Sequence, residues 1–412
     1  MDLYRARWLL PIDREPIESG EMLVDSERIV AVGDNLDATG AAVHDLGDLV
    51  LLPGLVNPHT HLELSCYREK LSTGSLWEWL EQLVTLRRQP GAAQGERAAV
   101  LDGAAQSLAA GVTCVGDISR TGMNVELLRG SPIRKVCFVE LFSGASQPPF
   151  DAASLRQVFQ VASTHTEPDR LMIGLSPHAP YSVSWSDLLG AIELADTHRL
   201  PLTMHFLETR DERQWLEGGG GPLANFLDRF GLPNAQTDRP RTAGDVLARS
   251  GLLDRAPLLA HVNYADDDLL NILSQGPISV VWCPRTHAFF GHSPHRWQEM
   301  ISLGINVCLG TDSLASSPSL SILDELRYLY RQTPDVDPGL LFDMATRRSA
   351  IALGMGDHFG SFASGKYADF VAIPWDPAGS GDPNLNILES EYPPVTTWIG
   401  GRCNGREPRN PH

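Results

Sequence analysis

Lysine is almost absent from this chain of 412 residues: only Lys70, Lys135 and Lys366 occur, so arginine supplies nearly all of the positive charge. The 33 lysine and arginine residues are outnumbered by 51 acidic residues, which gives a formal net charge of -18 at pH 7. A protein that binds nucleic acid needs a basic surface, so we expect no nucleic-acid partner. An acidic surface that favours solubility accounts for the charge.

Long apolar runs and closely spaced cysteines are also lacking. No stretch reaches the roughly eighteen apolar residues that a membrane-spanning helix needs, so we expect no membrane association. The segment Met1 to Pro11 lacks the basic, apolar and small-residue parts of a signal peptide. The six cysteines form no Cys-x-x-Cys pair, which argues against a zinc knuckle or a redox motif. These absences favour a cytoplasmic protein with reduced thiols.

The middle of the chain alternates short apolar runs with longer amphipathic segments, which is typical of strand–helix units around a parallel sheet. The candidate strands are Leu52–Val56, Val112–Asp117, Val136–Phe142, Met172–Ser176, Leu202–Phe206, Leu258–His261, Ser279–Cys283 and Asn306–Gly310. The long gap between the fifth and sixth strands contains Gly218–Gly221 and indicates an inserted loop. Eight parallel strands with intervening helices predict an α/β fold, a (β/α)8 TIM barrel.

Both ends of the chain depart from the barrel pattern. The N-terminal segment alternates apolar and polar residues between turn signals, and Gly365–Ile373 reads as a turn followed by a strand. We expect the two ends to pair in one small β-sandwich. The predicted domains are therefore a composite β-sandwich of residues 1–52 and 360–412 and a barrel of residues 53–359.

Histidine and aspartate side chains follow several of the predicted strands. His59 and His61 come directly after the first apolar run, and alternate residues of a strand share a face. His205, His261 and Asp312 stand at the same end of three further strands. Active sites of (β/α)8 barrels lie at the carboxyl ends of the strands. One such histidine is ordinarily structural, but this repetition predicts a catalytic site for Zn²⁺ or Fe²⁺.

Several motifs resemble those of the amidohydrolase superfamily and occur in the same order. The resemblance is specific to the branch that contains the cytosine, guanine, adenosine-type and S-adenosylhomocysteine deaminases and the triazine hydrolases. It covers nearly the whole chain. The motifs are Pro53–His61, His205–Thr209, Leu259–His261, Gly310–Ser313, Gly360–Ser361 and Gly365–Asp369.

The resemblance implies that one divalent metal ion is held by His59, His61, His205 and Asp312. Zn²⁺ is the preferred ion and Fe²⁺ the alternative. Binuclear relatives carry a carboxylated lysine on the fourth strand, and the segment Met172–Tyr181 contains no lysine. The sequence therefore favours a mononuclear site.

The resemblance also implies three catalytic residues. Glu208, three residues after His205, matches the glutamate that shuttles protons in the deaminases, although a surface carboxylate after a strand is the alternative. His261 matches the histidine that orients the attacking hydroxide, and Asp312 accepts its proton. A bound metal lowers the pKa of water from about 15.7 toward 7, so hydroxide can attack a carbon that bears an amino group and release ammonia.

Four residues are candidates for substrate contact. His178 ends the fourth strand, and Arg285 and His287 follow the seventh, where many relatives have Cys-Pro-x-Ser-Asn and this chain has Thr286–His287. Trp77, with Trp79, could form an apolar wall for a flat ring. Each has a structural alternative. His178 could be a structural histidine in a proline-stiffened loop, and Arg285 and His287 could pair with acidic residues. Trp77 could serve in ordinary packing.

These observations predict a hydrolytic deaminase of an aminated heterocycle. A 6-aminopurine nucleoside is the preferred substrate class, and aminodeoxyfutalosine is the most specific expectation. The alternatives are a triazine-type chlorohydrolase or an amide hydrolase of the same superfamily and, outside enzymes, a catalytically inactive structural barrel. The last is disfavoured because every expected ligand is present. The family resemblance further implies a homodimer.

Overall fold

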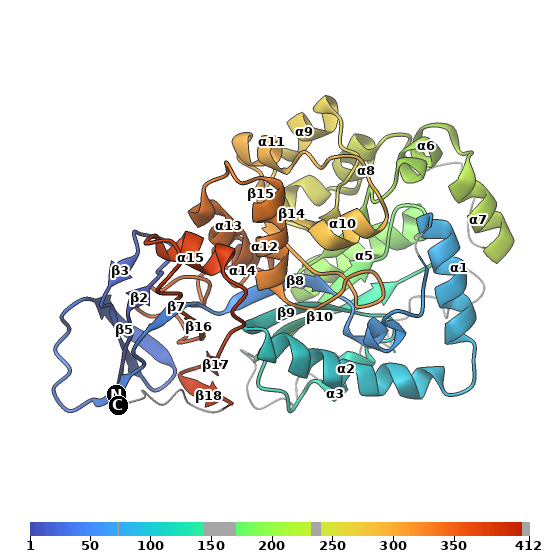
Figure 1. The fold of residues 1–412 in the computed structure, drawn as a ribbon. Helices are drawn as coiled ribbons and strands as arrows, with labels where there is room; N and C mark the ends of the chain where they lie inside the picture. The colour runs from blue at the N-terminus through green and yellow to red at the C-terminus, as the bar shows by residue number, and fades with distance from the viewer. Residues whose placement is uncertain (73, 144–169, 232–239, 406–412) are drawn as a thin grey trace.

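The computed structural model describes residues 1–72, 74–143, 170–231 and 240–405. A barrel occupies the centre of the molecule, and two β-sheets lie beside it (Figure 1). N-terminal strands alone form one of these sheets, and N-terminal and C-terminal strands together form the other. This arrangement confirms the predicted class, a (β/α)8 barrel with a small β-sandwich built from both ends of the chain.

The barrel consists of two parallel four-stranded runs. Isolated parallel bridges, Leu175 to Leu202 and Thr60 to Asp312, join the runs on both sides and close the circle. The strands are β8 (Leu55–Thr60), β9 (Val112–Ser119), β10 (Arg134–Leu141), β11 (Leu171–Pro177), β12 (Thr203–Phe206), β13 (Leu258–His261), β14 (Ser279–Trp282) and β15 (Asn306–Leu309). Nearly all of their residues are buried, because helices cover the outside and side chains fill the inside.

The first apolar run supplies two strands, so the predicted first strand Leu52–Val56 was wrong in its position. β7 (Leu49–Pro53) pairs with β16 (Phe370–Pro374) of a terminal sheet, and β8 begins only at Leu55. Gly54 separates the two strands, and a Cβ atom there would lie 2.1 Å from the Thr113 hydroxyl oxygen. Both strands are completely buried, so their hydrophobicity gives no sign of the break.

Residues from both ends of the chain form the two terminal sheets. One sheet contains β1 (Asp2–Arg5), β4 (Glu21–Asp25), β5 (Arg28–Gly33) and β6 (Ala42–Asp45). The other contains β2 (Trp8–Leu9), β3 (Ile17–Glu18), β7, β16, β17 (Thr396–Ile399) and β18 (Arg402–Asn404). Tyr4 of the first sheet packs edge-on against Phe370 and Trp398 of the second, so a shared aromatic core holds them together.

The helices connect the strands of the barrel or, after β15, lead into and through the terminal sheet that contains β16. In the described residues they are α1 (Leu76–Arg87), α2 (Ala92–Ala109), α3 (Met123–Leu127), α5 (Trp185–His198), α6 (Arg210–Gly218), α7 (Pro222–Phe230), α8 (Ala243–Ser250), α9 (Asp267–Leu273), α10 (Pro284–Phe289), α11 (Trp297–Ser302), α12 (Ile322–Gln332), α13 (Pro338–Ala345), α14 (Arg347–Ala352) and α15 (Pro383–Glu389), with 3-10 helices at Leu62–Tyr67 and Leu252–Asp254. None of the helices in these residues is long and apolar enough to cross a bilayer.

The connection from β12 to β13 contains helices α6, α7 and α8, so the inserted loop expected around Gly218–Gly221 was wrong. Gly219 ends α6 in the left-handed conformation, with φ of 73°. Gly221 precedes Pro222, the first residue of α7. The glycines therefore mark the turn between two helices, where left-handed backbone and a proline at the helix start are both favourable.

A buried ion pair joins the barrel to the terminal sheets. Arg134 at the start of β10 binds Asp369 through two hydrogen bonds, of 2.5 and 3.1 Å, and both side chains are 1% exposed. The Gly400 backbone N–H also donates to Asp369, at 2.7 Å. One carboxylate thus connects a barrel strand with the segment after β17.

Candidate active site

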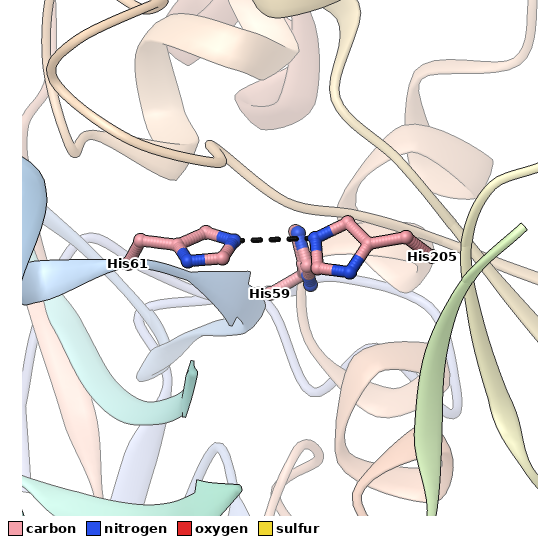
Figure 2. A group of neighbouring side chains, drawn as sticks. All are labelled: His59, His61 and His205. Atoms are coloured by element: carbon pink, nitrogen blue, oxygen red, sulfur yellow. Dashed lines mark hydrogen bonds between the residues drawn. The ribbon is translucent and has the colours of Figure 1, made fainter. Parts of the chain in front are cut away.

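Three histidines converge at the carboxyl ends of β8 and β12. One ring nitrogen from each of His59, His61 and His205 lies within 4.8 Å of the others. Figure 2 shows the three rings facing one another, and 3.3 Å separate Nε2 of His61 from Nε2 of His205. The three side chains therefore lie together at one mouth of the barrel, where the sequence predicted them.

Asp312 follows β15 and completes this cluster. Its Oδ1 lies 3.6 Å from Nε2 of His61 and 4.0 Å from Nε2 of His59. The residue has a left-handed backbone, with φ of 57°, and is held there because its N–H donates to the His59 carbonyl and its carbonyl accepts from the Thr60 hydroxyl. The Ser316 hydroxyl donates to Oδ2 at 3.0 Å. An uncommon backbone conformation fixed by several contacts is typical of a functional position.

The four side chains fit a divalent metal ion. His59 is fully buried, yet neither of its ring nitrogens has a hydrogen-bond partner among the described residues. Burial, with the neighbouring histidines, lowers the pKa values of His59 and His61 well below their ordinary range, and burial lowers that of His205 to about 4. Neutral imidazoles with free lone pairs beside a carboxylate are the ligands that a catalytic zinc or iron site requires.

Glu208 and His261 lie beside the cluster. Oε1 of Glu208 is 3.7 Å from Nε2 of His261, and both side chains are buried. Burial raises the pKa of Glu208 well above its ordinary value, and the carboxylates of Asp312 and Glu212 add to this effect. Glu212 accepts from the Glu208 N–H at 3.0 Å, and the Asn263 side chain donates to the Glu208 carbonyl at 3.0 Å. A buried carboxyl group with a raised pKa, on a residue whose backbone is fixed by two hydrogen bonds, is suited to general acid–base catalysis.

A cavity of about 430 Å³ opens in front of these side chains. This volume lies within the range of pockets for small ligands. Its residues near the histidine cluster include His61, His178, His205, Glu208, His261 and Asp312. Its wall includes the apolar side chains of Leu76, Trp79, Leu83, Phe226, Phe230 and Phe290 and the charged side chains of Arg87, Arg88, Arg120 and Glu140.

His178 follows β11 and lines the cavity, as the sequence predicted for a residue that contacts substrate. Its ring stacks on Phe142, with 4.5 Å between the ring centroids, and its Nδ1 is 2.6 Å from the Ser182 hydroxyl. Trp77 lies behind the wall, where its indole N–H donates to Asp211 at 2.6 Å. The neighbouring Trp79 borders the cavity.

Arg285 and His287 are not among the described residues that border the cavity. Arg285 binds Glu325 through a 2.7 Å hydrogen bond. Nδ1 of His287 is 3.0 Å from the side-chain oxygen of Asn263, the residue that supports the Glu208 carbonyl. The structure therefore places both side chains in contacts within the fold, and a role in substrate binding stays a prediction.

The sequence reasoning did not single out Glu140, Arg88 and Arg120. Glu140 stands near the carboxyl end of the third predicted strand, so the rule that located His205 and Asp312 would also have found it. Arg88, which follows α1, has no comparable sequence signal, because one arginine after a helix is ordinary.

A closed (β/α)8 barrel with a histidine and carboxylate cluster at one mouth defines the class of metal-dependent barrel hydrolases. The model of the amidohydrolase family matches residues 50–403, and the chain belongs to this family. It is an enzyme, a hydrolase that acts on carbon–nitrogen bonds other than peptide bonds.

Relatives and a solved structure resemble the chain over most of its length. It is 27% identical over 381 residues to an aminodeoxyfutalosine deaminase of a Nitratiruptor species, covering 89% of each chain. It is 30% identical over 356 residues to an adenosine deaminase of Helicobacter pylori, covering 84% of this chain and 85% of that relative. A crystal structure of an adenosine deaminase from Xanthomonas campestris with bound zinc has a TM-score of 0.83 at 21% identity, covering 98% of this chain and 93% of that one.

Proposed function

We propose that the chain is a metal-dependent hydrolytic deaminase of an aminated heterocycle, with a 6-aminopurine nucleoside such as aminodeoxyfutalosine as its substrate. The observation that supports this most is that Glu208, His261 and the cluster of His61, His205 and Asp312 all face one cavity. A proton-transferring carboxyl group and a metal site at one cavity are what hydrolytic release of ammonia requires. The names of the relatives support the same substrate class.

In this proposal His59, His61, His205 and Asp312 hold one divalent ion, Zn²⁺ in preference to Fe²⁺. When bound, such an ion lowers the pKa of water toward about 7. The zinc in the Xanthomonas structure agrees with this choice. Three imidazoles and one carboxylate are ligands that Zn²⁺ accepts readily.

The protein side chains then move the protons. Asp312 accepts a proton from the attacking water, and His261 orients the water oxygen. Glu208 protonates the ring nitrogen beside the carbon that bears the amino group, which makes this carbon more electrophilic. A carbon–oxygen bond forms, the new hydroxyl group passes its proton through Glu208 to the amino group, the carbon–nitrogen bond breaks, and the proton on Asp312 returns to Glu208. Water and the aminated ring thus give an oxo ring and ammonia.

A metal assay combined with ammonia release tests the proposal. The panel contains adenosine, aminodeoxyfutalosine, S-adenosylhomocysteine, guanine, cytosine, a pterin, an acyl amide and a chlorotriazine. We expect one metal ion per chain and ammonia from the aminopurine nucleosides. Activity on the amide or the chlorotriazine, with no ammonia from any aminated ring, would overturn the deaminase assignment.

A further inference from the structure

Glu140 on β10 presents a buried carboxylate to the cavity without a binding partner. The residue is 8% exposed and lines the cavity. Its Oε1 is buried and has no hydrogen-bond partner among the described residues. Nε2 of His178 lies 3.9 Å from this oxygen, which is too far for a hydrogen bond. Buried polar atoms of folded proteins nearly always have a partner, so an occupant of the cavity is the natural donor.

Cations lie near Glu140 but do not bind it. Arg87 is engaged by Glu63 at 2.6 Å and by Glu96 at 2.7 Å. Arg120 lines the same cavity, and within the described chain its guanidinium forms no ion pair. Burial and the neighbouring Glu63 raise the pKa of Glu140 to about 8, and the positive charges of Arg87 and Arg120 oppose this rise only in part. Hydrogen bonds donated to a carboxylate favour its ionised form, so an occupant with donor groups would bind Glu140 as the carboxylate. The cavity therefore holds a buried hydrogen-bond acceptor without a partner and, near it, a guanidinium that does not bind this acceptor.

We propose that Glu140 is a substrate-binding residue, which accepts hydrogen bonds from the sugar hydroxyl groups of a nucleoside while Arg120 donates to the same hydroxyl groups. A hydroxyl group is both donor and acceptor, so it matches a carboxylate and a guanidinium that stand apart. Dinucleotide-binding folds use an acidic side chain for ribose hydroxyl groups in the same way. The inference rests on the proposed function and adds that the enzyme selects nucleosides over free bases.

The position of Glu140 agrees with this role. One ligand atom each of His205, His178 and Glu140 lies within 4.8 Å of the other two. The ring centroids of His178 and His205 are 4.8 Å apart. His178 therefore adjoins both the metal-site histidine and Glu140, so a substrate that contacts His178 while it reacts at the cluster lies within reach of Glu140.

Two substrates and two variants test the assignment. The kcat/KM values of adenosine and 2′,3′-dideoxyadenosine are compared for the wild type, Glu140→Ala and Glu140→Gln. Hydrogen bonds to a charged group are worth about ten- to a hundredfold, so we expect the wild type to prefer adenosine by that factor, mainly through KM. Glu140→Ala should remove most of the preference by weakening adenosine alone, since only Arg120 then remains for the hydroxyl groups, and Glu140→Gln, which keeps one acceptor oxygen, should retain more of it.

Glu325→Gln is the matched control, because Glu325 is a fully buried carboxylate that lies outside the cavity lining and pairs with Arg285. It should keep the wild-type preference for adenosine. An equal loss on both substrates in Glu140→Ala would assign Glu140 to the positioning of His178 and overturn the proposal. Two metal ions per wild-type chain, falling to one in Glu140→Ala, would also overturn it.

Calorimetric binding separates this inference from the proposed function, because binding does not require turnover. Absence of ammonia from every nucleoside would overturn the function alone. About tenfold or tighter binding of adenosine than of 2′,3′-dideoxyadenosine, lost in Glu140→Ala, would still support the role of Glu140. Equal binding of both nucleosides by the wild type would overturn that role whatever the reaction.

Discussion

At the scale of single residues, Glu208 offers the most direct test of the chemistry. Glu208→Gln keeps the size of the side chain but removes its ability to exchange a proton. We expect ammonia release to fall by about 10²–10⁴ while the metal content stays at the wild-type level, since general acid–base groups contribute that much. Glu217→Gln, an exposed change on α6 with 52% side-chain exposure, is the control and should retain activity. Wild-type turnover in Glu208→Gln would remove the assigned role.

A group of histidines behind the site makes stability depend on pH. Burial is the main cause that lowers the pKa of His295 to about 3. It is also the main cause that lowers the pKa values of His287 and His292 to about 4. The unfolded chain therefore binds more protons than the folded chain between about pH 4 and pH 6.5. Their contribution to stability is present above pH 6.5 and decreases as the pH falls, by up to about 1.4 kcal/mol per pH unit for each histidine.

Urea unfolding at pH 7.5, 6.5 and 5.5 measures this dependence. His295→Gln should flatten the decrease, because the side chain no longer takes up a proton on unfolding. His198→Gln changes an exposed histidine of α5 and should leave the decrease unaltered. Identical slopes for the wild type and His295→Gln would contradict the expectation.

The sequence located the central residues because one rule applies to them all. His59, His61, His205 and Asp312 lie at or just after the carboxyl ends of parallel strands, and parallel strands of a barrel end at one mouth. The rule does not apply to residues of a helix such as Trp77. The side chains of Trp77 and Trp79 are both buried, and of these two only Trp79 borders the cavity. Spacing along a helix does not determine how far the helix is rotated against the barrel.

At the scale of elements, the contact between β8 and β9 controls the geometry of the site. A Cβ atom at Gly116 of β9 would lie 2.2 Å from the carbonyl oxygen of Pro58, the residue before His59. Gly116→Ala should therefore displace β8, lower metal content and activity together, and cost about 1–3 kcal/mol in stability. Metal assay, ammonia release and urea unfolding measure these effects.

Gly190→Ala provides the matched comparison. Gly190 lies inside α5, and a Cβ atom there would meet nothing within 4 Å. We expect this change to stabilise the chain by about 0.5–1 kcal/mol and to preserve activity, because alanine favours a helix over glycine. Loss of activity in both alanine variants would show that the effect at Gly116 is not specific to β8.

The strands were predicted best where turns or helices bound each apolar run on both sides. The runs at β9 to β15 each gave one strand near its predicted position, because each is bounded by turns or helices. The run from Leu49 to Val56 failed, since hydrophobicity is the same on both sides of Gly54. The helices α6 and α7 were missed because their glycines read equally as a loop or as helix ends.

At the scale of the whole molecule, the pair of Arg134 and Asp369 connects the barrel and the terminal sheets. Removal of one partner leaves a buried, unpaired charge, which costs about 3–5 kcal/mol. We expect Asp369→Ala to lower the free energy of unfolding by this amount. Asp48→Ala, which breaks an exposed pair with Arg7, should cost no more than about 1 kcal/mol. Equal effects in urea unfolding would contradict the structural role of the buried pair.

The pairing of β7 with β16 has a consequence for the order in which the protein is made. The ribosome produces Leu49–Pro53 more than 300 residues before Phe370–Pro374, the segment with which it pairs. Until the later segment emerges, β7 lacks one of its two neighbours in the sheet, and β8 with His59 follows it after one glycine. A nascent chain stalled before Phe370 should therefore carry an unfinished metal site, and the site becomes competent only after the segment of β16 has been synthesised.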